Sequence, residues 1–140
     1  MTIERENILD IGRDTIASEI RALTTLHSLL NDTFAEAVET IINCRGRLII
    51  TGLGKSGHIA RKIAATLTST GSRAIFLHAT EALHGDLGII SSDDVVIALS
   101  YSGETEEVIR VADYVIANNI TLIAITGKHQ STLAKRAHIV

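Results

Sequence analysis

Four short, nearly continuous apolar runs follow one another in the chain after Gly46. They are "LII", "AIFL", "VVIAL" and "TLIAI", at residues 48–50, 74–77, 95–99 and 121–125. Runs of this kind are typical of strands that are covered on both faces. Helical segments are expected between and after them, at about residues 56–70, 104–117 and 131–137, with a shorter turn at 81–84. The alternation predicts an α/β fold, a doubly wound parallel sheet with right-handed crossovers and helices on both faces.

Two amphipathic helices are predicted before the sheet. From Ile3 to about Leu30, apolar residues recur at helical spacing, at Ile8, Ile16, Ile20, Leu23, Leu26 and Leu30. A second helix starts within "NDTFAEAVETIIN", where Thr33 and Glu36 have the spacing of a capping box. The first apolar row is long for one small sheet to cover, so we expect part of it to pair with another subunit.

The chain is expected to form one domain that is cut short at its C-terminal end. Its 140 residues suit a single domain, in which residues 1–45 are the N-terminal helical segment and residues 46–140 carry the sheet. The last residues, Ile139 and Val140, have the character of the start of a fifth strand. Because a complete domain usually ends on a polar or capped element, we expect truncation at that strand.

Composition and charge exclude several classes of function. The formal net charge of -3 leaves no basic stripe for a nucleic-acid backbone. No apolar run has the length of a membrane span, and the N-terminus lacks a signal-peptide core, so we expect a cytoplasmic protein without nucleic-acid or membrane partners. Cys44 is the only cysteine, which excludes an intramolecular disulfide and a thiolate metal cluster and suggests a small buried residue.

The glycine-rich string "TGLGKSG" follows the first apolar run and precedes a helix. Its "GKS" matches the end of a Walker A loop, but the glycine that this loop needs further upstream is replaced by Ile49, inside a strand. Gly52, Gly54 and Gly57 do satisfy the dinucleotide fingerprint G-x-G-x-x-G. The acid that should end the second strand is missing, so a nicotinamide enzyme stays open only as a weaker alternative.

Hydroxyl groups gather where the third strand is expected to end. In "SYSGET", Ser100 and Ser102 alternate along the turn, Gly103 permits a tight backbone, and Thr105 is predicted in the first turn of the next helix. In a parallel sheet, ligands bind beyond the carboxyl ends of the strands. Hydroxyls and free amides at a helix N-terminus favour an anion, so we predict a phosphate monoester site here, with Ser56 contributing from the neighbouring turn.

These motifs resemble a known family. "SYSGET", "GLGKSGHIARKIAATLTSTG" and "EALHGDLG" together resemble the SIS (sugar isomerase) domain, and the chain looks like the arabinose-5-phosphate isomerase family within it. The similarity runs from about Glu36 to the end of the chain. The resemblance implies a flavodoxin-like three-layer sandwich that interconverts D-ribulose 5-phosphate and D-arabinose 5-phosphate. It also implies a homodimer or homotetramer, no cofactor, and a place in the Kdo route of lipopolysaccharide synthesis.

The resemblance also implies roles for individual residues. The phosphate site is expected to contain Ser56, Ser100, Ser102 and Thr105. Catalytic or substrate-contacting roles are implied for Lys55, His84 and Glu107, and further substrate contacts are expected from Gly54, Tyr101, Gly103 and Glu104. Family members place a further glutamate and histidine after the fifth strand, beyond the last residue of this chain. Their position puts the activity of the chain by itself in question.

Isomerisation of an aldose to a ketose needs a base that moves a proton between C1 and C2 and a group that stabilises the enediolate oxygen. Lys55 can neutralise the phosphate or polarise the carbonyl, and the pKa range of His84 suits ring opening or proton transfer. Each residue also has a simpler interpretation, Lys55 as a solvated surface lysine and His84 as a histidine that fixes a loop. No metal is expected. A phosphosugar-binding regulatory module without catalysis remains the alternative function.

Overall fold

The computed structural model describes residues 5–140 of the chain. Residues 3 and 4, where the first helix was predicted to start, lie outside this part. The chain divides into two compact units, the first ending at Phe34 and the second running from Ala35 to Val140. This boundary lies inside the second helix rather than at residue 45, so most of that helix belongs with the sheet. That the whole chain forms a single domain stays a prediction.

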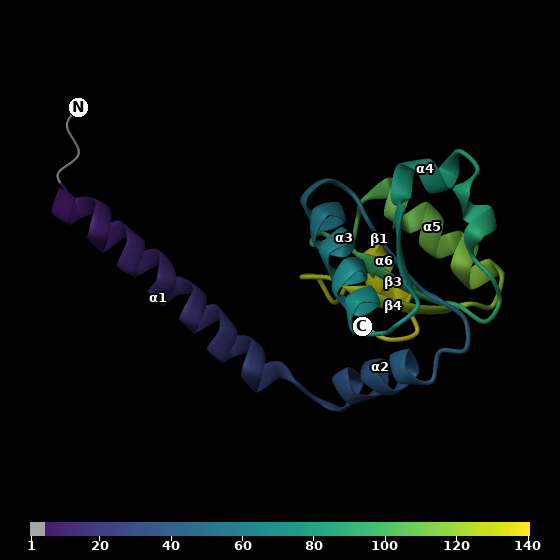
Figure 1. Cartoon of the computed structure of the whole chain (residues 1–140), viewed down its shortest axis with the longest axis horizontal. Helices are drawn as coiled ribbons and strands as arrows, with labels where there is room; N and C mark the ends of the chain where they lie inside the picture. Colours follow the sequence, from purple (N-terminus) through teal and green to yellow (C-terminus); the bar gives the residue numbers. More distant parts are fainter. Residues whose placement is uncertain (1–4) are drawn as a thin grey trace. The chain divides into compact units, whose positions relative to one another are not determined.

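The two predicted N-terminal helices are present as α1 (Arg5–Leu29) and α2 (Asp32–Ile42), shown in Figure 1. The cap of α2 differs from the prediction. Asn31 Oδ1 accepts hydrogen bonds from the backbone amides of Thr33, at 3.0 Å, and Phe34, at 3.4 Å. The capping box predicted at Thr33 and Glu36 is therefore wrong, because Asn31 precedes the helix and provides the acceptor. Among the described residues, no helix combines the length and apolar character needed to cross a membrane.

The four predicted strands form one parallel sheet. They are β1 (Leu48–Gly52), β2 (Ala74–His78), β3 (Val95–Leu99) and β4 (Thr121–Ile125). Their order is β2-β1-β3-β4, with Leu48 opposite both Ala74 and Val95, and Val95 opposite Thr121. Ile139 pairs in parallel with Ile123 of β4, at the place where the fifth strand was predicted to begin.

The helices after each strand also follow the prediction closely. They are α3 (Gly54–Ser69), α4 (Ala79–Leu83), the 3-10 helix η1 (Asp86–Ile89), α5 (Glu106–Ala117) and α6 (Thr132–Arg136). The short turn predicted near residue 81 is longer than expected, since it comprises both α4 and η1. Thr105 lies one residue before α5 as its N-cap, and not in the first helical turn.

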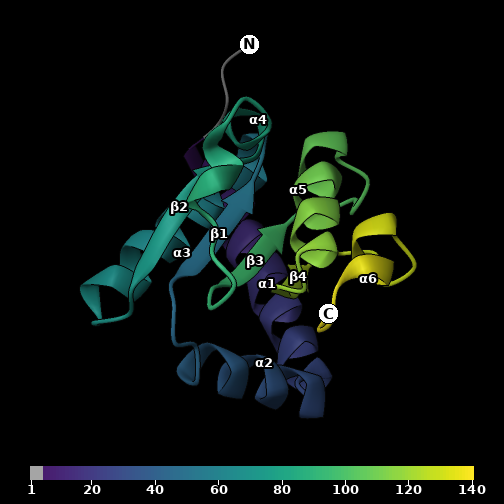
Figure 2. The same cartoon turned by 90° about the vertical axis from the view of Figure 1, so that its right-hand side faces the viewer.

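Helices cover both faces of the sheet. On one face, Leu48, Ile50 and Ile97 pack with Ala60 and Ala64 of α3, and the second half of α2 contributes Ala37 and Ile41. On the other face, Ile49, Val96 and Leu122 pack with apolar residues of α4, α5 and α6. Figure 2 shows α3 on one side of the strands and α5 and α6 on the other. This is the predicted doubly wound arrangement, and the predicted fold class is confirmed.

Buried polar groups close the amino ends of the strands. The buried carboxylate of Asp94 accepts hydrogen bonds from the amides of Arg47, at 2.6 Å, and Ser91, at 2.8 Å. Cys44 is only half-buried, and its Sγ lies 3.5 Å from the carbonyl oxygen of Arg47. Since these groups satisfy one another, this edge of the sheet is structural.

Thr51 differs from these groups because it is a buried polar residue without a partner. It is fully buried in β1, and its hydroxyl makes no hydrogen bond within the part of the chain that the structure describes. Burying an unpaired hydroxyl costs about 1–3 kcal/mol. We therefore expect Thr51→Val, which keeps the shape of the side chain, to raise the free energy of unfolding by about 1 kcal/mol in urea titrations.

Thr68→Val is the matched control for this substitution. The Thr68 hydroxyl lies 2.9 Å from the carbonyl oxygen of Ala64 and 2.8 Å from that of Ala74. Removing a paired hydroxyl should lower the free energy of unfolding. A Thr51→Val protein that is less stable than the wild type would show that its hydroxyl does have a partner in solution.

Candidate functional site

A cavity of about 370 Å³ opens at the carboxyl ends of β1, β3 and β4. It is lined by Lys55, Ser56, Ile59, Leu99, Ser100, Tyr101, Ile125, Thr126 and Gly127. The chain leaves β1 toward α3 on one face of the sheet and leaves β3 toward α5 on the other face (Figure 2). The loops after these neighbouring strands therefore diverge, which creates the crevice in which open α/β sheets bind ligands.

The glycines of "TGLGKSG" allow α3 to begin close to β1. A Cβ atom on Gly57 would lie 3.0 Å from the carbonyl oxygen of Gly52, and one on Gly52 would lie 3.1 Å from the backbone of Ser56. Gly54 has φ +57°, a left-handed conformation that suits glycine. These packing needs account for the G-x-G-x-x-G pattern without a dinucleotide. They place Lys55 and Ser56 in the first turn of α3, beside the cavity.

The loop after β3 is organised by the side chain of Ser100. Ser100 is buried, its Oγ accepts a hydrogen bond from the amide of Gly103 at 3.1 Å, and it lies 2.9 Å from Thr105 Oγ1. Ser102 Oγ accepts a hydrogen bond from the amide of Glu104 at 3.2 Å. Thr105, although it is the N-cap residue, makes no side-chain hydrogen bond to the first turn of α5. The N-terminus of this twelve-residue helix is thus left without a side-chain cap.

Tyr101 and the segment after β4 form the far wall of the cavity. The carbonyl oxygen of Tyr101 accepts hydrogen bonds from the amide of Gly127, at 3.1 Å, and from Thr126 Oγ1, at 3.3 Å. A Cβ atom on Gly127 would lie 2.6 Å from the Tyr101 ring, so the glycine is needed for this contact. Thr126 also lines the cavity. It follows directly after the fourth strand, where ligand-binding residues were expected, but was not among the predicted site residues.

The side chain of Glu104 contacts α6. Its carboxylate accepts a hydrogen bond from the amide of Thr132, at 2.8 Å, and so caps α6. This backbone hydrogen bond lowers the pKa of Glu104, and the nearby cations Lys135 and Arg136 lower it further. Glu104 and Ser102 lie in a second hollow that borders Gly127 and the loop up to Ser131. The structure therefore places Glu104 toward α6.

The predicted catalytic residues are only partly brought together. Lys55 lines the cavity, whereas His84 and Glu107 do not. His84 is exposed at the end of α4, which follows the edge strand β2 and packs against α5. Glu107 is half-buried in the first turn of α5, and its neighbour Glu106 is exposed and pairs with Arg110 at 2.8 Å.

The arrangement places several groups that favour negative charge beside the cavity. The first turns of α3 and α5 both start at the cavity side of the sheet, where helix dipoles and free amides favour negative charge. Lys55 adds a formal positive charge, and Ser56 and Ser100 add hydroxyls. Within residues 5–140, no three His, Cys, Asp or Glu side chains are placed to hold a metal ion.

The comparisons with known proteins agree with one another. The SIS domain profile matches residues 41–140. The chain is 45% identical over 133 residues to "Arabinose 5-phosphate isomerase GutQ" of Salmonella typhi, and 46% identical over 125 residues to "Arabinose 5-phosphate isomerase KdsD" of Pseudomonas aeruginosa. These matches cover 95% and 89% of this chain, but only 41% and 38% of the two relatives. The chain thus spans less than half the length of the curated relatives that it matches.

A solved structure shows the same fold at higher coverage. The structure of the protein c3406 of E. coli CFT073, in complex with arabinose 5-phosphate, superposes with a TM-score of 0.92 and is 36% identical in sequence. The match covers 98% of this chain and 73% of that one. The sheet order, the glycine-dependent start of α3 and the hydroxyl loop before α5 all lie within the segment that the family profile matches. This chain belongs to the SIS domain family.

Proposed function

We propose that this chain carries the sugar-phosphate site of an aldose–ketose isomerase that interconverts D-ribulose 5-phosphate and D-arabinose 5-phosphate. The observation that carries the proposal is the meeting of Lys55, Ser56 and Ser100 in one cavity, close to a helix N-terminus without a side-chain cap. The curated relatives bear the name of this activity, and the similar solved structure contains arabinose 5-phosphate. The chain spans 41% of the length of the first of these relatives, so the activity of the whole enzyme is a proposal for this chain.

The phosphate group is proposed to bind at the N-terminus of α5. Ser102, Thr105 and the amides of the first turn offer hydrogen-bond donors there, and Ser56 approaches from α3. Ser100 has a double role in this proposal, because its hydroxyl also accepts the Gly103 amide and meets Thr105. Gly54, Tyr101 and Gly103 contribute backbone positions around the ligand. A dianion is favoured at such a site because charge-assisted hydrogen bonds are stronger than neutral ones.

The isomerisation step requires proton transfer between C1 and C2 of the open-chain sugar. We assign to Lys55 the role of neutralising the phosphate or polarising the carbonyl oxygen. Glu107 and His84 are the proposed acid–base groups. His84 lies outside the cavity within one chain, so we propose that it completes the site of a neighbouring subunit. No cofactor and no metal take part in this reaction scheme, which we place in the cytoplasm and in the Kdo route of lipopolysaccharide synthesis.

A phosphosugar-binding module without catalysis is the second candidate. The observation that favours it is that, of the three predicted catalytic residues, only Lys55 lines the cavity. Such a module would keep the hydroxyl loop and bind the sugar phosphate without converting it. Binding and turnover therefore have to be measured separately, on the same protein.

The first test concerns binding of the phosphate group. Ser102→Ala removes one hydroxyl from the loop while leaving the Ser100 hydrogen bonds in place. We expect the Kd for arabinose 5-phosphate, measured by calorimetry, to rise about tenfold, with the thermal unfolding midpoint nearly unchanged. Ser92→Ala, an exposed serine before β3, is the control. Equal affinity of the Ser102→Ala and wild-type proteins would remove Ser102 from the site.

The second test separates catalysis from binding. We expect Lys55→Ala to lower kcat/KM for conversion of ribulose 5-phosphate at least a hundredfold, since it removes the only lysine that lines the cavity. The product is followed by nuclear magnetic resonance. Lys62→Ala is the control, because Lys62 is exposed further along α3 and bonds Thr66 at 2.9 Å. Wild-type protein that binds the sugar phosphate but never converts it would support the non-catalytic module instead.

Self-association is proposed from the apolar row on α1. Ile16, Ile20 and Leu23 follow one another at helical spacing and are about 60% exposed, at 63%, 59% and 65%. Apolar rows of this kind are usually buried against another surface. We propose that α1 pairs with a second copy of the chain, in a homodimer or homotetramer.

Light scattering after size-exclusion chromatography tests this pairing. The double substitution Ile20→Glu with Leu23→Glu places two carboxylates in the apolar row, and we expect the measured mass to fall to that of one chain because buried unpaired charges are costly. Arg21→Glu introduces the same side chain outside the row and should leave the mass unchanged. If the double variant and the wild type have equal masses, α1 is not the pairing surface.

A further inference from the structure

The phosphate loop, residues 100–105, is held from outside by the segment that follows β4. The amide of Thr132 donates to the Glu104 carboxylate at 2.8 Å, and the amide of Leu133 donates to the carbonyl oxygen of Gly103 at 3.0 Å. The amide of Gly127 donates to the carbonyl oxygen of Tyr101 at 3.1 Å. Three of the loop's acceptors are thus used by one segment, and two of the three donors belong to α6.

The loop and α6 also touch without space between them. Gly103 has φ +65°, and a Cβ atom added to it would collide with the side chain of Ser131 and approach Thr126 Oγ1 to 3.0 Å. Ser131 is itself buried and caps α6 by accepting a hydrogen bond from the amide of Ala134 at 3.3 Å. A shift of α6 would therefore be transmitted directly to Gly103.

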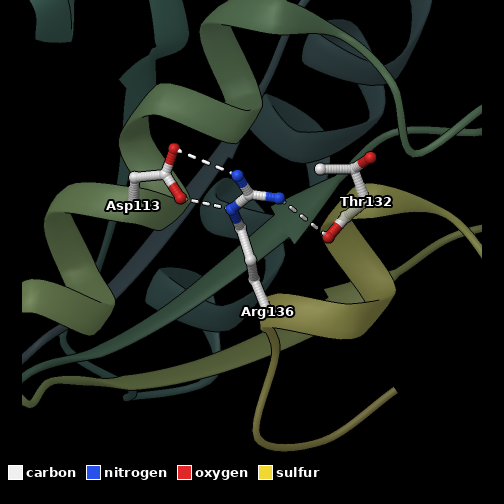
Figure 3. Close-up of polar contacts among 3 residues, drawn as sticks. All are labelled: Asp113, Thr132 and Arg136. Atoms are coloured by element: carbon white, nitrogen blue, oxygen red, sulfur yellow. Dashed lines mark hydrogen bonds and ion pairs between the residues drawn. The ribbon is translucent and has the colours of Figure 1, made fainter.

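An ion pair fixes α6 to α5 at its other end. Figure 3 shows Arg136 of α6 between Asp113 of α5 and the carbonyl oxygen of Thr132. The guanidinium makes two contacts with the carboxylate, of which the Nη2 to Oδ2 contact is 3.5 Å, and its Nη1 donates to the Thr132 carbonyl oxygen at 3.4 Å. Thr132 is therefore held by Arg136 through its carbonyl group and by Glu104 through its amide.

We propose that Glu104 is a positioning residue, which braces the phosphate loop against α6 and does not contact the substrate, and that Asp113 and Arg136 support the same brace from α5. This inference rests on the proposed function, because it concerns the loop that binds the phosphate. It assigns roles to two residues, Asp113 and Arg136, that lie outside the cavity. It also gives Glu104 a different role from the substrate contact that the sequence suggested.

The charges around Glu104 favour a positioning role over a contact with the substrate. A carboxylate beside a phosphate dianion is repelled, so an ionised Glu104 would weaken binding if it faced the ligand. On the α6 side, the same charge meets the Thr132 amide and lies near Lys135 and Arg136, which lower its pKa and keep it ionised at neutral pH. The charge is thus stabilised by the contacts that Glu104 makes with α6.

Four variants of the full chain test the brace. Glu104→Ala removes the acceptor, Glu104→Gln keeps an acceptor without the charge, and Asp113→Asn weakens the remote ion pair. Glu39→Ala is the matched control, since Glu39 is an exposed glutamate of α2, outside the loop, α5 and α6. Each protein is titrated with arabinose 5-phosphate and with inorganic phosphate, and hydrogen exchange is measured at the amides of Gly103 and Glu104.

We expect Glu104→Ala to lower the affinity for both ligands about tenfold and to speed hydrogen exchange at the amides of Gly103 and Glu104. Asp113→Asn should change both readouts in the same direction by a smaller factor, Glu104→Gln should recover most of the affinity, and Glu39→Ala should match the wild type. A purely structural role would lower the unfolding midpoint without changing the affinity of the folded protein, which would overturn the proposal.

A direct contact between Glu104 and the substrate predicts a different set of results. If Glu104→Ala weakened arabinose 5-phosphate alone, with inorganic phosphate binding and amide exchange unchanged, Glu104 would touch the sugar and the brace would be overturned. Wild-type protein that bound neither ligand would contradict the proposed function instead. In that case the exchange rates at Gly103 and Glu104 would still decide whether α6 holds the loop.

Discussion

The contact between Gly103 and Ser131 is the constraint on which the site depends. No side chain fits at Gly103, because Ser131 occupies the space and the backbone is left-handed there. This close approach lets Leu133 bond the Gly103 carbonyl oxygen and brings Thr132 within reach of Glu104. Ser100 then lines the cavity, while the carbonyl oxygen of Gly103 faces α6.

The two edges of the sheet illustrate why only one of them is suited to binding. At the amino edge, the Asp94 carboxylate satisfies the amides of Arg47 and Ser91, so the polar groups are paired within the fold. At the carboxyl edge, the Thr105 hydroxyl meets Ser100 and makes no side-chain bond to the first turn of α5. Unpaired donors at a helix N-terminus favour an anion, and membership of the SIS family is consistent with that preference.

The same reasoning explains why the cavity holds only part of the proposed machinery. Lys55 and Ser56 arrive there because α3 starts at β1, in the middle of the sheet. His84 follows β2, which is the edge strand, and does not line the cavity.

The periodicity of apolar residues was enough to locate all four strands and the helices between them. The serines after the third strand could be singled out as candidate ligand-binding residues because hydroxyls at a strand end form a local sequence pattern. The capping box at Thr33 was misjudged because Asn31 offers a competing acceptor one residue before the helix. The hydrogen-bond partners of Glu104 and Gly103 could be identified only in the folded structure. They lie on α6, more than twenty residues away in sequence, and a contact across that separation depends on packing that no local spacing encodes.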